Sequence, residues 1–169
     1  MNTKTPKESR AILTEMVLPN DTNNLKNLMG GRLLHWMDIA AAITASRHCN
    51  NLAVTASVNN VSFGNPIPQG SIVTLEANIS RAFASSMEIF IDVWIEDTIT
   101  TKKTKCNEAI YTFVAVDNKG KPTSVPTVTP VSEIEKTRYD GALRRRQLSL
   151  ILSGKMKAKD ATELKALFL

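Results

Sequence analysis

The sequence has few of the residues on which metal sites and disulfide scaffolds depend. Its 169 residues include two cysteines, Cys49 and Cys106, and two histidines, His35 and His48. Two cysteines are too few for a disulfide framework, and a chain of this length needs none to build a core. The histidines belong to no Cys/His cluster with the spacing that zinc requires, so we expect no metal ion.

A long apolar run is also missing. No stretch approaches the roughly 18 apolar residues of a membrane span, and residues 1–10 lack the apolar core of a signal peptide. We therefore expect a cytoplasmic protein with no membrane partner. The hydrophobic fraction of 43% and the charged fraction of 22% are typical of a globular chain with one core.

The basic excess is modest, with a net charge of +5, and much of it lies late in the chain, at Arg144–Arg146, Lys155, Lys157 and Lys159. Aromatic residues make up 5% of the sequence, and none interleaves with these charges as a nucleic-acid platform would need. We therefore expect no nucleic-acid partner. An anionic small molecule such as a phosphorylated cofactor fits the charge, and a solvated basic tail is the simplest interpretation of Arg144–Arg146.

Hydrophobic periodicity predicts one strand, one long helix and then four strands. Residues 10–18 fit a first strand, and the turn-rich stretch 19–24 leads to a helix from Gly30-Gly31 to about His48. That helix is apolar on nearly every face, which predicts burial. Alternation predicts antiparallel strands within 52–63, 73–80, 87–96 and 109–115, with a bulge at Asn59-Asn60 in the first of them.

The end of the chain is predicted to add helices to this core. Prolines at 122, 126 and 130 favour an extended linker. Residues 132–135 match a capping box that opens a helix to about Leu152. After Ser153-Gly154, the apolar pattern of Ala161, Leu164, Leu167 and Phe168 predicts a short last helix. We therefore predict an α+β fold at 1–125, one central helix wrapped by a curved antiparallel sheet of about five strands. At 126–169 we expect a linker and helical extension packing on the same domain.

Asp38 is the most unusual residue of the predicted helix, because it stands in the apolar stretch 33–43. Burying an unpaired carboxylate costs on the order of several kcal/mol. Either Asp38 is paired by Thr, Asn or backbone donors, or it performs chemistry. His35 lies one turn earlier and is close enough to pair with it, although a core or interface histidine is the simpler interpretation.

Gly30 and Gly31 stand at the start of the same helix, where the first amides lack internal partners. Glycine lets a ligand carbonyl approach those amides closely, although a flexible helix start is the simpler alternative. Asp38 is eight residues further on, roughly 12 Å along the axis at ~1.5 Å per residue. If both serve one reaction, they must come from two antiparallel helices, as a two-fold dimer provides. The apolar outer side of the helix also needs a second subunit to cover it.

Other polar residues around the helix are weaker candidates. Turn formation is the default for Asn23 and Asn27, and an amide that orients a water across the interface is the functional alternative. Cys49 and His48 are adjacent and point different ways on a helix, so we expect no Cys–His nucleophile pair.

Several short segments, taken together, carry a family resemblance. They are Pro19–Asn23, Met29–Gly31, Met37-Asp38, Ala45–Cys49, Val54–Val58, Phe63, Pro66-Ile67, Gly70, Ser85–Ile89 and Tyr111–Val114. In order and spacing they resemble the hot-dog-fold acyl-CoA thioesterases of the cytosolic acyl-CoA hydrolase type, over most of residues 10–140. Many of those relatives have His where this chain has Met29, and often Gly where it has Lys26. We expect both differences to bear on acyl-chain preference or loop shape.

The resemblance implies a division of roles. The family's helical acid, which matches Asp38, acts as general base or nucleophile. A loop asparagine, matching Asn23, works with it from the partner protomer, and the amide matching Gly30 polarises the thioester carbonyl. The family is commonly hexameric, as a trimer of dimers.

The expected reaction is therefore hydrolysis of acyl-CoA to a carboxylic acid and free CoA, with no resident cofactor. Arg81, Ser85 and Ser86, at a turn between strands, are candidate CoA contacts, although turn composition alone explains the serines. Two alternatives stay open. One is a hydratase or dehydratase of acyl thioesters, which pairs a His with an acid, and the other is a non-catalytic acyl-CoA-binding or sensing module.

Overall fold

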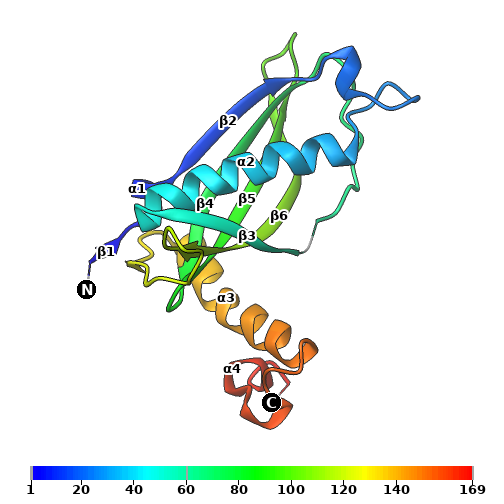
Figure 1. The fold of residues 1–169 in the computed structure, drawn as a ribbon. Coiled ribbons are helices and arrows are strands. Elements are labelled where there is room, and N and C mark those ends of the chain that lie inside the picture. The colour runs from blue at the N-terminus through cyan, green and yellow to red at the C-terminus, as the bar shows by residue number, and fades with distance from the viewer. Residues whose placement is uncertain (1, 60, 169) are drawn as a thin grey trace.

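The computed structural model describes residues 2–59 and 61–168 and shows a long helix wrapped by a curved sheet (Figure 1). The sheet is antiparallel and five-stranded, in the order β2-β4-β5-β6-β3. Its strands are β2 (Ala11–Met16), β3 (Leu52–Asn59), β4 (Ile72–Ala82), β5 (Ser86–Glu96) and β6 (Lys103–Val116). The predicted α+β fold, with one central helix and about five strands, is confirmed.

The placement of β3 means that the sheet is not a simple meander. Strands β4, β5 and β6 are consecutive neighbours, but β3 pairs with β6 at the far edge of the sheet. The strand ends at Asn59 and does not reach Phe63, because Phe63 turns away to lie against the start of the central helix. Asn60 is outside the described residues, so the bulge predicted at Asn59-Asn60 is untested. The register of β3 shifts instead between Thr55 and Ser57.

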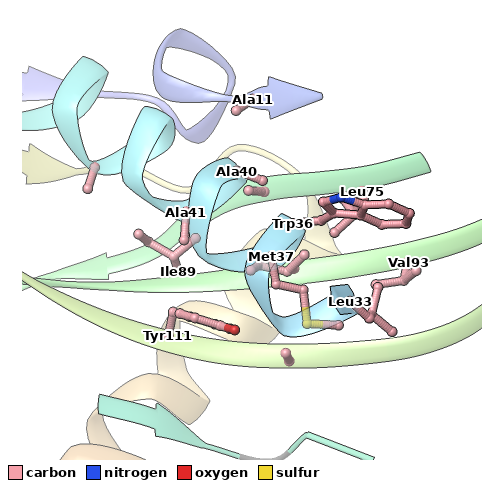
Figure 2. Packing of buried hydrophobic residues seen from close by; sticks show 14 of the residues in the cluster. Ala11, Leu33, Trp36, Met37, Ala40, Ala41, Leu75, Ile89, Val93 and Tyr111 are labelled. Carbon is pink, nitrogen blue, oxygen red and sulfur yellow. The ribbon is translucent and has the colours of Figure 1, made fainter. Parts of the chain in front are cut away.

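The central helix α2 (Gly30–Cys49) lies on the inner face of the sheet. Figure 2 shows Met37, Ala40 and Ala41 of this helix among the core side chains of the strands. These three residues are completely buried, and the small alanines allow close packing of helix on sheet. Burial is not complete, however, since Ile39 and Ile43 are 37% and 38% exposed. One stripe of the helix is thus left uncovered within the protomer.

The C-terminal turn of α2 is bonded to the N-terminal segment and to the segment that follows β6. His48 Nδ1 lies 2.9 Å from Ser9 Oγ of the short helix α1 (Pro6–Ser9), and His48 Nε2 lies 2.9 Å from the Pro126 carbonyl. Lys4 Nζ donates to the His48 carbonyl at 2.9 Å. Beside these contacts, β1 (Thr3–Lys4) pairs in parallel with β7 (Thr127–Val128). The Pro126 carbonyl only accepts, so Nε2 donates, whereas the Ser9 hydroxyl can donate to Nδ1 of a neutral ring or accept from Nδ1 of a charged one.

Burial lowers the pKa of His48 below its ordinary value of 6.5. The unfolded chain therefore binds this proton more readily than the folded chain. We expect neutral His48 to make its full contribution to the free energy of unfolding above about pH 6.5. That contribution is lost as the pH falls through the lower pKa of the folded state. Urea unfolding of wild type and His48→Gln between pH 5 and 7.5 measures the difference. His48→Gln should lose this pH dependence, whereas His35→Gln, which removes an exposed histidine, should keep it. If the free energy of unfolding changes equally with pH in all three proteins, His48 is not the source of the pH dependence.

The outer face of the sheet carries the helix α3 (Glu133–Leu152), which ends near the short helices η2 (Ala158–Asp160) and α4 (Thr162–Lys165). The capping box that opens α3 is confirmed, with Glu135 N donating to Ser132 Oγ. In the described part of the chain, no helix is both long and apolar enough to cross a membrane.

The interpretation of Arg144–Arg146 as a solvated tail is wrong for two of the three residues. Arg145 donates from Nε and Nη2 to both carboxylate oxygens of Glu88, at 3.0 and 2.7 Å. Arg146 stacks on the Phe83 ring and donates to Ser86 Oγ. The outer face of β5 carries the buried carboxylates Glu88 and Asp92. Arg145 of α3 pairs with Glu88, while Arg138 of α3 and Lys105 of β6 both pair with Asp92.

Candidate active site

Asp38 lies at the middle of α2 and is paired by a residue of β3. Thr55 Oγ1 donates to Asp38 Oδ1 at 2.8 Å. Asp38 is half-buried, and its second oxygen accepts no hydrogen bond from the described residues. A threonine thus pairs one oxygen of this carboxylate, and the other oxygen stays available to a water or a substrate, so the pairing and the chemical role are compatible.

Thr55 is a site residue that sequence reasoning missed. It is separated from Asp38 by 17 positions, and in the sequence it reads only as one member of an alternating strand. The register shift of β3 begins at Thr55. Bulges of this kind re-aim side chains near functional sites, and this local irregularity leaves no sequence signal of its own.

Tyr111 of β6 supports the same turn of α2 from the core side. Its hydroxyl donates to the Leu34 carbonyl, one turn before Asp38, at 3.1 Å. Burial, and secondarily the charge of Asp38, raises the pKa of Tyr111 to about 12. The phenol therefore stays protonated and acts as a fixed donor that ties the sheet to the helix at the level of Asp38.

Gly30 begins α2 after Met29, whose side chain makes no capping bond. The amides of Arg32 and Leu33 donate to the Met29 carbonyl, at 3.0 and 3.1 Å. Within residues 2–59 and 61–168, the amides of Gly30 and Gly31 have no acceptor. A Cβ at Gly30 would lie 3.3 Å from the tip of the Phe63 ring, so a larger residue here would require this partly exposed ring to shift by a few tenths of an ångström. The helix therefore starts with two free donors at the positive end of its dipole.

Asn23 lies in the loop that precedes α2, and a backbone bridge between Thr22 and Leu28 closes this loop. Its Oδ1 accepts from the amides of Leu25 and Asn27, at 2.9 and 3.2 Å. The Nδ2 group makes no hydrogen bond with the described residues and is exposed. The turn uses the acceptor end of this side chain and leaves the donor end free.

A single protomer brings Thr55 to Asp38, but it does not bring Gly30 or Asn23 there. Figure 1 shows the loop before α2 at the N-terminal end of the helix, whereas Asp38 is two turns further along. Beside Asp38, the edge strand β3 leaves Val58 exposed opposite Tyr111, on the face that Thr55 also shares with α2, whereas Leu52 and Val54 are exposed on the other face of the sheet. Ile39 and Ile43 of α2 are exposed as well, and the outer edge of β3 has no neighbouring strand, so this side of the protomer is an uncovered surface. A second copy on this surface is what the arrangement lacks.

The candidate CoA contacts lie elsewhere, on the outer face and the β4–β5 turn. Ser86 Oγ accepts from Arg146, as described above, and the Ser85 carbonyl accepts from Ala115 N at 2.9 Å. Arg81 donates to the Tyr139 carbonyl at 3.2 Å and stacks on the Tyr139 ring. Arg81 and Ser86 are therefore held against α3 and Ser85 against β6, and none of the three contacts Asp38.

A groove of about 550 Å³ adjoins them, between the C-terminal half of α3 and the strands β3, β5 and β6. Arg146 is at its wall, and burial lowers the pKa of this arginine from its ordinary value. In the described residues, no three His, Cys, Asp or Glu side chains gather as a metal ion would require.

Comparison with known proteins gives consistent matches. Residues 25–102 match the family model described as the thioesterase superfamily. The uncharacterized acyl-CoA thioester hydrolase YkhA of Bacillus subtilis is 41% identical over 139 residues, which cover 82% of this chain and 81% of that protein.

Solved structures agree with this. An acyl-CoA hydrolase of Staphylococcus aureus, in complex with butyryl coenzyme A, coenzyme A and coenzyme A disulfide, has a TM-score of 0.84 and 37% identity. The match covers 97% of this chain and 99% of that one. An apo-hexameric acyl-CoA thioesterase also has a TM-score of 0.84, with 38% identity over 86% of this chain and 94% of that one.

Proposed function

Because the chain belongs to the acyl-CoA thioester hydrolases of the thioesterase superfamily, we propose that it hydrolyses acyl-CoA to a carboxylic acid and free CoA. The observation that carries this is the 41% identity to a named acyl-CoA thioester hydrolase over four-fifths of both chains. The likeness to a hydrolase solved with coenzyme A supports the same reaction.

The active site of this proposal is shared between two protomers. With two α2 helices antiparallel across the exposed stripe, Asp38 of one protomer faces the partner's Gly30. Asp38 takes a proton from a water as the water oxygen bonds to the thioester carbon. The Gly30 amide holds the resulting oxyanion. The C–S bond then breaks, and the CoA thiolate receives the proton from Asp38.

Asn23 orients the water in this proposal. Its Oδ1 is used by Leu25 and Asn27, so only Nδ2 is available, and this group donates. A water that accepts from Nδ2 and donates to Asp38 has its remaining lone pair free to attack. All groups in the reaction come from the chain itself, so we propose no resident cofactor or metal.

Direct attack of the Asp38 carboxylate on the thioester carbon is an alternative mechanism that stays open. It forms an acyl–aspartyl anhydride and releases CoA before water enters. Rapid-quench single-turnover hydrolysis separates the two routes. Mass spectrometry of the peptide that contains Asp38 should show the added mass of the acyl group if Asp38 is the nucleophile, and the unmodified mass throughout the turnover if Asp38 is a base.

We propose that the oligomer is a trimer of dimers, with the dimer formed through α2 and β3. Related solved proteins are described as hexameric. An edge strand with exposed Leu52, Val54 and Val58 is a template for pairing with a second chain. A cytoplasmic location remains part of this proposal.

The two sequence-based alternatives have less support. A hydratase needs a histidine paired with an acid, and among the described residues no histidine bonds to Asp38; His48 is held by Ser9 and Pro126. One experiment distinguishes the second alternative, a non-catalytic binding module, from a hydrolase. Thiol release should be measured across acyl-CoAs of increasing chain length, beside equilibrium binding. We expect release with at least one chain length, whereas binding without release would show a non-catalytic module.

Thr55→Val tests the pairing of Asp38. Loss of one hydrogen bond to a charged group is expected to lower kcat roughly tenfold, because the carboxylate is no longer oriented. Thr55 lies on an exposed edge, so the free energy of unfolding should change by less than about 1 kcal/mol. Steady-state kinetics and urea unfolding measure the two effects. Thr55→Ser keeps the hydroxyl and should retain most of kcat; an equal loss in both variants would contradict the role of the hydrogen bond.

A further inference from the structure

A second carboxylate beside the helix start is buried and has no part in the reaction described above. Asp21 ends the short helix η1 (Pro19–Asp21) and is 7% exposed. Its Oδ2 accepts from the Leu18 amide at 3.0 Å, and its Oδ1 lies 2.9 Å from Arg32 Nε. The Asp21 carbonyl also accepts from the Met29 amide at 2.9 Å. One residue thus contacts the chain on both sides of Gly30, at Met29 before it and at Arg32 after it.

These contacts take the place of the missing helix cap. Most helices have their first turn fixed by a side chain of the N-cap residue, but Met29 supplies none. Here the direction of the first turn is set by the Met29–Asp21 bond and by the Arg32–Asp21 ion pair. A side-chain cap would occupy amides of the first turn. Fixing the turn through Asp21 holds the helix start while leaving the Gly30 and Gly31 amides free.

The pair also sets the charge around those amides. The Asp21 side chain is 10% exposed, so its negative charge is screened less than a surface charge. Asp21 bonds to Met29 and Arg32, which flank Gly30 closely in the chain, so an unbalanced charge on its carboxylate would oppose an oxyanion at the Gly30 amide. Arg32 cancels that charge, and the dipoles of the free amides remain as the local field.

We propose that Asp21 and Arg32 are a positioning pair that aims the Gly30 amide and keeps its surroundings electrically neutral for the oxyanion. The proposal rests on the hydrolase function above. Neither residue touches the substrate. Both act through the first turn of α2.

Three variants test the pair: Arg32→Gln, Asp21→Asn and the double variant. Arg32→Gln leaves the Asp21 charge unbalanced and should lower kcat roughly 10- to 30-fold, a fraction of the loss on removing an oxyanion donor. KM should change by less than about twofold, because ground-state binding is little affected. Asp21→Asn can still accept the hydrogen bond from the Leu18 amide, and it leaves the positive charge of Arg32 near the oxyanion. We therefore expect kcat to fall only about threefold or less. The double variant is neutral again and should recover most of the loss of Arg32→Gln.

This recovery distinguishes the proposal from a merely structural role, in which the double variant would be the worst of the three. Arg10→Gln is the matched control, since it breaks another ion pair, Arg10–Glu76 at 2.8 Å, far from Gly30. It should leave kcat unchanged. Thermal unfolding and sedimentation confirm that each variant is folded and assembled.

The outcomes are separable. If wild type hydrolyses no acyl-CoA, the proposed function fails. If wild type is active but Arg32→Gln matches it within twofold, or the double variant is no better than Arg32→Gln, the positioning pair is overturned.

Discussion

Replacing Asp38 by asparagine is expected to lower kcat by roughly 10³-fold, the contribution of a well-placed general base. The amide cannot take a proton from water, and it is a poor nucleophile if Asp38 attacks directly. KM should stay within a few-fold, because the side chain keeps its size and position. Thiol release with the best acyl-CoA substrate, measured under saturating conditions, gives kcat directly.

The same substitution should leave the fold intact. The amide oxygen that replaces the Asp38 carboxylate oxygen can still accept from Thr55, and the side chain is only half-buried. Asp140→Asn, on the exposed side of α3, is the matched control for loss of one negative charge and should keep wild-type kcat. If hydrolysis by Asp38→Asn equals that of wild type, Asp38 is not part of the mechanism.

Mixing two inactive variants is expected to restore activity. Asn23→Asp keeps the Oδ1 acceptor that holds the loop but removes the Nδ2 donor, so it disables the site with little change to the turn. In a dimer of Asn23→Asp with Asp38→Asn, one site combines both defects and the other has neither. Random mixing makes half of the dimers mixed, so activity should return to about a quarter of wild type.

The two variants should be purified separately and then co-refolded, with each carrying a different affinity tag. Tandem purification isolates mixed oligomers, and their thiol release is compared with that of each variant alone. Absence of recovery in oligomers that contain both chains would mean that Asn23 and Asp38 act within one protomer. That result would rule out the shared site, although the chain would still be a hydrolase.

The sequence was sufficient where the determining interactions are local. The alternation of β4 and β5 and the apolar pattern of α2 predicted their positions to within about two residues, whereas β6 begins at Lys103, six residues before its predicted start. Asp38 was identifiable because a charge in an apolar helix violates the local pattern. The Gly30 amides were identifiable because helix starts always leave donors free.

Long-range pairing was not predictable in the same way. Period-two alternation fixes which residues share a face, but not which strand is the neighbour, so the placement of β3 beside β6 came only from the structure. The Thr55–Asp38 bond follows from that placement. Glu88 and Asp92 resembled solvent-facing residues of a sheet, and only the docking of α3 shows why they need Arg145 and Arg138.

The parallel bridge between β1 and β7 has a consequence for how the protein is made. Thr3 pairs with Thr127 and Lys4 with Val128, so β1 is synthesised well before the strand with which it pairs. The sheet and α2 can collapse while the N-terminal segment waits for its partner. The corner around His48 is therefore completed late in synthesis, when the start of the chain and the linker close over the last turn of the central helix together.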